Sequence, residues 1–161
     1  MNRYYSLLLL APFTAPAFAA DPPSPAEVRK VMQYYQDGSD VMLVESKFCT
    51  EVEKAGDNKN ECAEEINATT IEEGSRPLVW MNFFVPGSDS ANVLIQFKHK
   101  GKALKSDEMS LSNAIRYRTW KSLPTSKTGP WEIAVEQETA EGYRPVTTLS
   151  YSVVEKVERA E

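Results

Sequence analysis

The sequence predicts a mainly β protein, an antiparallel β-sandwich of about seven or eight short strands with one N-terminal α-helix. After residue 40, apolar and polar residues alternate in short runs, as strands with one buried face do. Clusters of Gly, Pro, Ser, Asn and Asp separate these runs at regular intervals. A hydrophobic content of 42% is ordinary for a globular domain with its own core. We therefore expect residues 20–161 to form a single sandwich domain.

The first residues have the pattern of a cleavable export signal. Arg3 provides a positive start, Leu7 to Leu10 form an apolar run, and residues 17–19 (Ala-Phe-Ala) form a small-residue end. The alternative, a retained membrane anchor, needs about 20 apolar residues, and Pro12 interrupts this shorter run. We therefore expect residues 1–19 to be a signal peptide, no membrane span after its cleavage, and a periplasmic or secreted product.

Residues 24–37 predict the one helix. Ser24 is a suitable N-cap, Pro25 suits the first turn, and Glu27 can complete a capping box. Gly38 is well placed to end the helix. One apolar face follows the i, i+3, i+4, i+7 spacing and consists of Val28, Val31, Met32 and Tyr35.

The two cysteines, Cys49 and Cys62, predict one structural disulfide within a hairpin over about residues 41–68. Two cysteines in an exported chain most simply pair with each other. The polar stretch 54–60 suits a turn that brings Cys62 back opposite Cys49. The alternative, a redox pair or a thiol nucleophile, lacks the C-x-x-C spacing and a nearby histidine. On the outgoing strand, the residues expected to share the apolar face are Met42, Val44, Phe48 and Val52.

Further strands are expected along the rest of the chain. Large apolar residues fill 78–85, and shorter alternating runs follow it before each turn. These runs are centred on 93–97, 109–111, 115–120, 131–135 and 146–154.

Residues 78–154 contain a succession of motifs with a known counterpart. A strand and turn at 93–101 precede the arginine-rich strand 116–120, and the run 128–135 (TGPWEIAV) follows a Ser/Thr loop. This succession resembles the small immunoglobulin-like sandwich modules found in uncharacterised bacterial envelope proteins. The resemblance implies an Ig-like sandwich in which Trp131 packs on the core, and it brings no catalytic residues.

The sequence contains few candidate catalytic residues and no catalytic motif among those considered. The only histidine, His99, lies in a Lys-His-Lys-Gly turn, where a solvated loop residue is favoured over a base or a ligand. No G-x-S-x-G motif occurs, and with the cysteines paired the chain cannot readily supply a zinc site. We therefore expect no enzyme activity, no cofactor and no metal.

The charges are divided along the chain. Residues 45–73 are rich in carboxylates, but no D-x-D-x-D-G loop arranges them for calcium, so a solvated acidic face is favoured. Residues 76–128 are rich in Lys and Arg, while the total charge of −5 argues against nucleic-acid binding. Within the basic half, Arg116, Arg118 and Trp120 alternate and so share one side of their strand.

Two interpretations of that trio remain open. Arginines beside an exposed aromatic can hold an anionic or sugar-like ligand, or a partner's hot spot. Alternatively, Trp120 belongs to the core and the two arginines pair with the acidic hairpin. The sequence thus predicts an exported, non-enzymatic binding or interaction module of the bacterial envelope, whose partner is another envelope protein or an anionic or sugar ligand. The alternative function is a hydrolase of envelope polymers that uses a pair of carboxylates.

Overall fold

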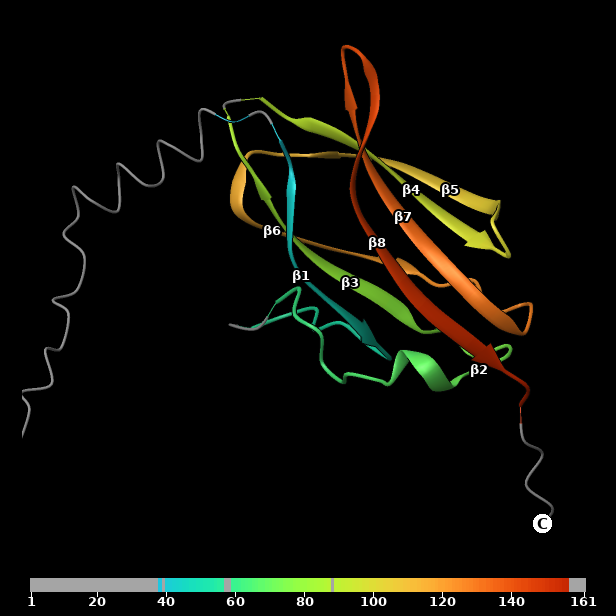
Figure 1. Cartoon of the computed structure of the whole chain (residues 1–161). Helices are drawn as coiled ribbons and strands as arrows, with labels where there is room; N and C mark the ends of the chain where they lie inside the picture. The colour runs from blue at the N-terminus through green and yellow to red at the C-terminus, as the bar shows by residue number, and fades with distance from the viewer. Residues whose placement is uncertain (1–37, 39, 57–58, 88, 157–161) are drawn as a thin grey trace, which may run out of the picture.

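The computed structural model describes residues 38, 40–56, 59–87 and 89–156, and within them the protein is mainly β (Figure 1). The expected signal peptide (1–19) and the expected helix (24–37) lie outside the described residues. Eight strands and one 3-10 turn are present in this part of the chain. They are β1 (Met42–Cys49), η1 (Ala68–Thr70), β2 (Ile71–Glu72), β3 (Leu78–Val85), β4 (Ala91–His99), β5 (Lys102–Leu111), β6 (Ala114–Ser122), β7 (Gly129–Thr139) and β8 (Gly142–Val154).

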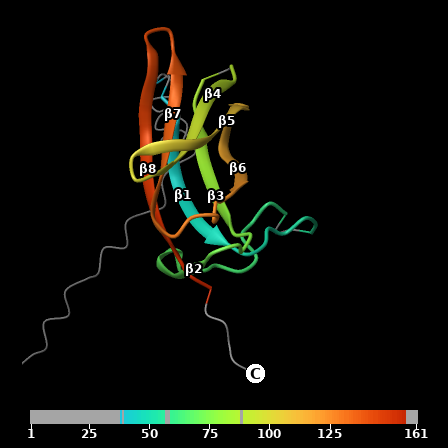
Figure 2. The same ribbon diagram turned by 90° about the vertical axis from the view of Figure 1, so that its right-hand side faces the viewer.

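The strands form two sheets that pack face to face, as the side view makes clear (Figure 2). The smaller sheet has the order β1-β3-β6 and the larger one the order β2-β8-β7-β4-β5. The prediction of an antiparallel sandwich is confirmed for all pairings but one, because the two-residue strand β2 runs parallel to β8. Parallel pairing joins segments far apart in the chain, so a local sequence pattern does not reveal it.

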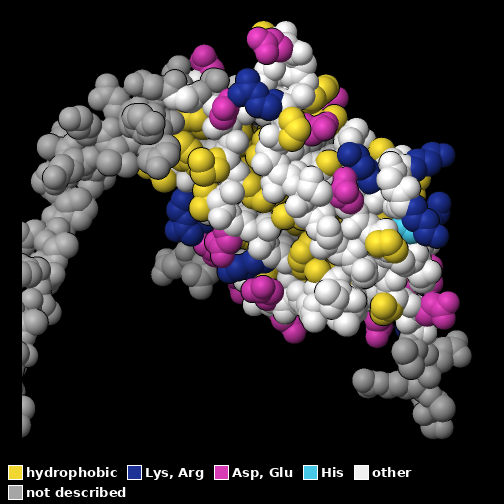
Figure 3. All heavy atoms as spheres, in the orientation of Figure 1, with side chains coloured by type: hydrophobic (Ala, Val, Ile, Leu, Met, Phe, Trp, Pro, Cys, Tyr) yellow, Lys and Arg dark blue, Asp and Glu magenta, His cyan; other side chains and the backbone are white. Residues whose placement is uncertain are grey.

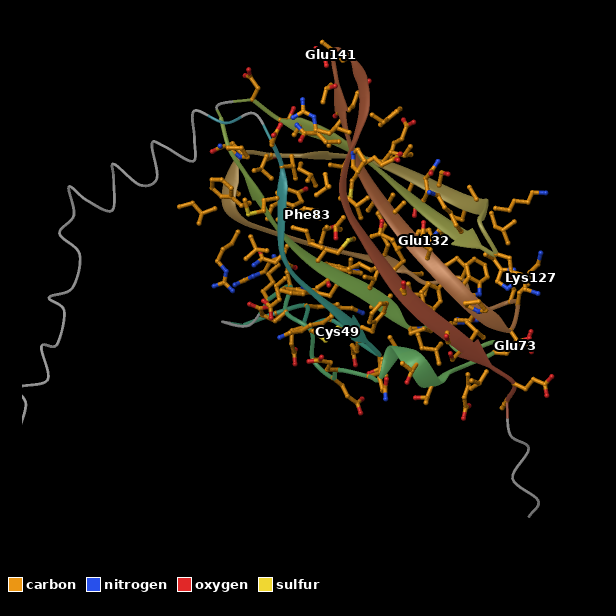
Figure 4. The ribbon with its side chains drawn as sticks, in the orientation of Figure 1. Cys49, Glu73, Phe83, Lys127, Glu132 and Glu141 are labelled. Atoms are coloured by element: carbon orange, nitrogen blue, oxygen red, sulfur yellow. A yellow bond between two sulfur atoms is a disulfide. The ribbon has the colours of Figure 1, made fainter. Side chains whose placement is uncertain are left out.

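The core lies between the sheets, where alternate residues of each strand point inward. Val79, Met81, Phe83 and Val85 of β3 are all fully buried there, opposite the inward residues of β4 and β7. Figure 4 shows Phe83 between the two layers. The expected alternation in 93–97 and 131–135 is confirmed, and the inward set includes Val93, Ile95, Phe97, Trp131, Ile133 and Val135.

β1 departs from the expected pattern. Met42 and Val44 were expected on the core face with Phe48, yet they are 50% and 57% exposed. A bulge between Leu43 and Glu45 places an additional residue in β1, so the alternation changes phase there. Leu43 packs against the core instead. The assignment of Met42 and Val44 to the core face is therefore wrong.

The hairpin after β1 is closed by the Cys49–Cys62 disulfide, with the two Cα atoms 5.8 Å apart. Its two arms are antiparallel but too irregular to form continuous strands, with isolated bridges at Cys49–Glu65 and Val52–Cys62. Backbone bonds hold the arms together, among them Ala63 N to Glu51 O at 3.0 Å. The predicted pairing of the cysteines within a hairpin is confirmed.

Candidate functional site on the outer face of the small sheet

The outer face of the small sheet carries the residues that the sequence singled out. On β3, Trp80 and Asn82 alternate with the inward residues and so point away from the core. In the register of β6 against β3, Trp120 lies opposite Trp80 and Arg118 lies opposite Asn82. On the other side of β3, Lys47 of β1 lies opposite Trp80. Three adjacent strands thus present one continuous row of charged and aromatic side chains.

The disulfide hairpin folds over half of this face and buries Trp80 completely. The indole Nε1 of Trp80 donates a hydrogen bond of 2.6 Å to the carbonyl oxygen of Asn60 in the hairpin. Cys49 and Val52 pack around the same ring and form a second small core, separate from the main one. In Figure 2 the hairpin projects on the side away from β7 and β8, and Figure 4 places Cys49 at its base. The hairpin therefore covers the half of this face that carries Trp80.

Arg118 fastens the hairpin to the sheet. Its guanidinium Nη2 lies 2.7 Å from Glu61 Oε1, and its Nη1 lies 3.5 Å from the carbonyl oxygen of Lys59. Only 23% of the Arg118 side chain is exposed. The hypothesis that the arginines pair with the acidic hairpin thus holds geometrically for Arg118, which has little capacity left for another ligand.

Arg116 and Trp120 differ from Arg118. The Arg116 side chain is 58% exposed and reaches Glu61 only at 3.5 Å. Trp120 is 38% exposed, unlike its cross-strand neighbour Trp80. Trp120 does not belong to the core. The interpretation that Trp120 is buried while both arginines pair with the hairpin therefore does not describe all three residues. The accessible pair on this face is Arg116 and Trp120.

Two polar atoms below this surface lack hydrogen-bond partners among the described residues. Asn82 is only 4% exposed, and its Oδ1 accepts no hydrogen bond. Arg118 Nε, on the residue paired with Asn82, is also buried and donates to no acceptor. A buried donor and a buried acceptor without partners are costly, and here they belong to two residues paired across β3 and β6. Nothing in the sequence singles out Asn82.

One signal in the sequence could have located the covered half. The run Val79, Trp80, Met81 is apolar on both faces of β3, and strands that are apolar on both faces are buried on both. Trp80 therefore implied that some other segment covers the outer face. Glu61, by contrast, resembled the other carboxylates of the hairpin and could not be distinguished from them.

A group of apolar side chains lies on the other half of the same face. Met42 of β1 pairs with Phe84 of β3, and Ile115 of β6 lies at the bulge opposite Phe84. Ile115 and Val44 are each 57% exposed, and Phe84 is partly buried. Figure 3 views the molecule from the side of the larger sheet, where apolar, basic and acidic side chains are interspersed. We call Met42, Val44, Phe84 and Ile115 the apolar patch.

The remaining candidates for chemistry lie elsewhere. His99 Nε2 is 3.0 Å from the carbonyl oxygen of Thr128, and its ring packs at 4.9 Å from Trp131. Glu108 and Glu138 line a hollow of about 230 Å³ on the larger sheet, where Asn92 donates to Glu138 at 2.9 Å. Across the described stretches, no three His, Cys, Asp or Glu side chains are grouped to hold a metal ion. Nor does any helix in those stretches have the length and apolarity to cross a membrane.

Comparisons with known proteins show similarity at the level of structure alone. No family model and no curated protein sequence matches the chain. The CARDB domain of the PF1109 protein from Pyrococcus furiosus, crystallised in complex with di-metal ions, has a TM-score of 0.40 and 12% identity, with 73% of this chain and 94% of that chain covered. An engineered protein has a TM-score of 0.31 and 14% identity, with 56% of this chain and 18% of that chain covered. Similarity this distant supports no conclusion about ligands or partners.

Proposed function

We propose that the protein is a non-enzymatic binding module exported to the envelope of a bacterium, and that it binds its partner through Arg116 and Trp120. The observation that supports this proposal most is the 38% exposure of Trp120 on the same strand face as the open Arg116 side chain. Tryptophan and arginine are the residue types most enriched where partners bind tightly. Arg118 supports the site by holding the hairpin beside it.

The chemistry of the site favours a partner with a negative group next to a flat or apolar surface. Arg116 offers a guanidinium that can hold a carboxylate or phosphate through two parallel hydrogen bonds. Trp120 offers a ring face for an apolar side chain or for the C–H face of a sugar. The site lies on β6, which is an edge strand of the small sheet. An edge strand can also contribute backbone groups to a bound segment.

The hydrolase alternative has its best candidate in Glu108 and Glu138. These carboxylates line an open hollow beside Tyr143, whose side chain is half exposed. Catalysis by a carboxylate pair needs a site that surrounds the substrate and excludes water, and an open sheet surface does not provide one. We therefore do not propose hydrolysis.

Capture of partners from an envelope extract tests the proposal. The protein, beginning at Ala20 and with its disulfide intact, is immobilised as wild type, as Arg116→Ala, as Trp120→Ala and as Leu104→Ala. Leu104 is the matched control because it is 41% exposed on β5 of the other sheet. We expect a partner that wild type and Leu104→Ala retain and that both site variants release, with a loss of affinity of about tenfold or more per variant.

Two outcomes would contradict the proposal. If the site variants and wild type retain the same partners equally, Arg116 and Trp120 do not form the site. If wild type retains nothing that the immobilisation support alone does not, the protein does not act as a binding module under these conditions. Binding of the captured partner at low and high salt then separates the two contributions, since only the Arg116 contact weakens with salt.

A further inference from the structure

The outer edge of β6 has a regular backbone that pairs with no other strand of the described chain. β6 ends the small sheet, with β3 on one side of it only. Figure 2 shows β6 on the far side of β3 from β1. From Tyr117 to Ser122 the register against β3 is unbroken, and the bulge of β6 lies before this stretch. Such an edge presents a row of backbone donors and acceptors to any strand that approaches it.

The hydrogen bonds to β3 identify the backbone groups that face away from the sheet. Leu123 N donates to the carbonyl oxygen of Pro77 at 3.0 Å, so these two opposite residues form a hydrogen-bonded pair. Along an antiparallel ladder, bonded and non-bonded pairs alternate, and a residue of a non-bonded pair directs its N–H and C=O away from its partner. The non-bonded positions of β6 are therefore Ser122, Trp120 and Arg118, and their backbone groups face the open side.

A second contact supports this orientation. Lys105 Nζ, which belongs to β5 of the other sheet, donates to the carbonyl oxygen of Ser122 at 3.2 Å. That carbonyl thus points out of the small sheet, as the alternation requires. Among the described residues, no hydrogen bond reaches the N–H or the C=O of Trp120 from the open side, and the same holds for Arg118. Two consecutive outward positions of β6 can therefore accept a further strand.

The residues with these open backbone groups also form the proposed partner site. Trp120 and Arg118 direct their side chains to the outer face, where the Arg116 guanidinium is 58% exposed. Side chains directly opposite each other in an antiparallel pair lie on the same face, with Cβ atoms about 5 Å apart. A strand added to β6 would thus place one side chain beside Trp120, and the side chains two and four positions later beside Arg118 and toward Arg116.

We propose that the partner binds by strand addition, as an extended acidic segment that pairs antiparallel with residues 118–122 of β6. This inference rests on the proposed function, because it names the partner of the same site. The segment has an apolar or aromatic residue opposite Trp120 and a Glu or Asp two and four positions later. Backbone hydrogen bonds hold the segment on the edge, and its contacts with Trp120 and Arg116 select it.

The charges of β6 favour an acidic segment over a second copy of this chain. β6 contains Arg116, Arg118 and Lys121 and no acidic residue. Pairing of two β6 edges would bring these basic residues of both copies together, which is unfavourable. Glu61 lies 2.7 Å from Arg118 and 3.5 Å from Arg116, so one carboxylate is shared by two guanidinium groups. Positive charge therefore remains on this edge for a carboxylate of the partner.

The other sheet edges are less suited to such a segment. The register of β1 is interrupted between Leu43 and Glu45, and β2 has only two residues. β5 contains Asp107, paired with Lys105 at 3.2 Å, and Glu108 beside it, so an acidic segment would meet like charges there. Bulges, short strands and charges of this kind are features that keep an edge from pairing.

Amide exchange measured by NMR on the chain beginning at Ala20 tests whether the edge is open. In the protein alone, the amides of Trp120 and Ser122 should exchange about tenfold or more faster than those of Thr119 and Lys121, which are bonded to β3. Slow exchange of Trp120 and Ser122 at every concentration would mean that another segment of the same chain occupies the edge. Slow exchange that develops with concentration would mean that a second copy does. Either result would overturn the proposal.

A synthetic peptide with blocked ends, Thr-Val-Thr-Trp-Thr-Glu-Thr-Glu-Thr, supplies the partner strand. We expect it to bind and to slow the exchange of Trp120 and Ser122 by about tenfold or more. N-methylation of its Trp and of its first Glu, whose N–H groups would face β6, should weaken binding by about tenfold or more. N-methylation of the Thr after each of them is the matched control and should leave binding unchanged. Absence of binding, or equal effects of the two methylated peptides, would contradict strand addition.

A substitution in β6 tests the same pairing from the side of the protein. Ser122→Pro removes an outward N–H and places a ring at the open edge, while the ladder to β3 and the Arg116 and Trp120 side chains remain. It should weaken peptide binding by about tenfold or more, whereas the matched control Ser122→Ala should not. Slow exchange in β7 (Gly129–Thr139) verifies that each variant is folded.

The same variants separate this inference from the proposed function. A partner captured from the envelope extract that Arg116→Ala and Trp120→Ala release, but that Ser122→Pro retains, would leave the binding site in place and overturn strand addition alone. A partner that all three variants release and that Ser122→Ala retains would support both. If Arg116→Ala and Trp120→Ala have no effect on the captured partner, the proposed function fails, and the inference that rests on it fails as well.

Discussion

Arg116 and Arg118 are two residues apart on the same face of β6, yet they are in different environments. Arg118 lies under the hairpin and is bound to Glu61 at 2.7 Å, whereas Arg116 extends into solvent and approaches the same carboxylate only at 3.5 Å. A charged hydrogen bond gains strength as water is excluded from it, and an exposed ion pair contributes little. At the residue scale, the trio identified in the sequence therefore divides into one structural residue, Arg118, and two available ones, Arg116 and Trp120.

This division predicts different effects of two similar substitutions on stability. Arg118→Ala should lower the free energy of unfolding by about 1–2 kcal/mol, because it removes the short bond and leaves the partly buried Glu61 without its partner. Arg116→Ala should change it by less than about 0.5 kcal/mol. Urea unfolding of both variants gives the comparison. Combining each variant with Glu61→Gln completes a double-mutant cycle, which gives the interaction free energy of each arginine with Glu61. Equal interaction free energies for Arg116 and Arg118 would contradict the assignment of a structural role to Arg118 alone.

The disulfide hairpin is the element that gives the small sheet its second core. Without it Trp80 would lie on an open face, since Val52 and Cys62 of the hairpin pack with it in this second core. The hairpin arms form only isolated bridges, so the disulfide contributes what a continuous ladder would otherwise supply. The cover of the sheet therefore depends on the redox state of a single bond.

Removal of that bond should destabilise the protein measurably. A closed loop of about 15 residues contributes roughly 3 kcal/mol in the chain-entropy model, so Cys49→Ala/Cys62→Ala should unfold at clearly lower urea. Trp80 should also become more exposed and shift the fluorescence to longer wavelength. Trp131 remains in the main core and Trp120 is already partly exposed, so a shift reports on Trp80. An oxidised and a reduced sample of wild type that unfold alike would contradict this prediction.

Element by element, the sequence predicted what local pattern determines. The strands at 78–85, 93–97 and 131–135 follow from alternation or continuous apolar runs, and the turn at Lys100–Gly101 follows from Gly101, which adopts a positive φ without strain. The facing of Met42 and Val44 could not be predicted, because a bulge changes the alternation without a signature in composition. The parallel pairing of β2 with β8 depends on a partner some 80 positions away, as Ile71 pairs with Val153.

For the candidate site, the sequence did not predict which side chains would be buried. Alternation placed Arg116, Arg118 and Trp120 on one side, and the register with β3 supports this. Which of them the hairpin would cover depends on how a loop folds over the sheet, and spacing along the strand contains no such information. Asn82 was invisible for the same reason, since it stands alone among apolar neighbours in the sequence and matters only through its position opposite Arg118.

At the scale of the whole molecule, the two outer faces are unlike each other. The larger sheet exposes mainly polar and charged side chains, such as Lys98, which pairs with Glu132 at 3.6 Å, and only scattered large apolar ones, namely Leu104, Tyr143 and Val154. The smaller sheet exposes the apolar patch, Arg116 and Trp120. Water hydrates a polar face well, whereas a group of exposed apolar side chains marks a surface suited to contact with other groups. Contacts with other layers and partners are therefore expected on the small-sheet side, where both proposals lie.

The disulfide also connects the fold to the location of the protein, because such bonds form and persist in oxidising compartments. We expect a bacterial host to export the full chain, to cleave it after Ala19 and to oxidise both cysteines, so that intact mass shows a chain from Ala20 lacking two hydrogens. The thiol assay must be done in denaturant, since Cys49 is fully buried and would escape a reagent in the folded protein whether or not it is oxidised. In denaturant we expect no alkylation before reduction and two alkylated cysteines after it. A chain that reacts before reduction would mean that the cysteines do not meet an oxidising compartment, and the proposed envelope location would then be wrong. A chain that retains residues 1–19 would contradict the cleavage.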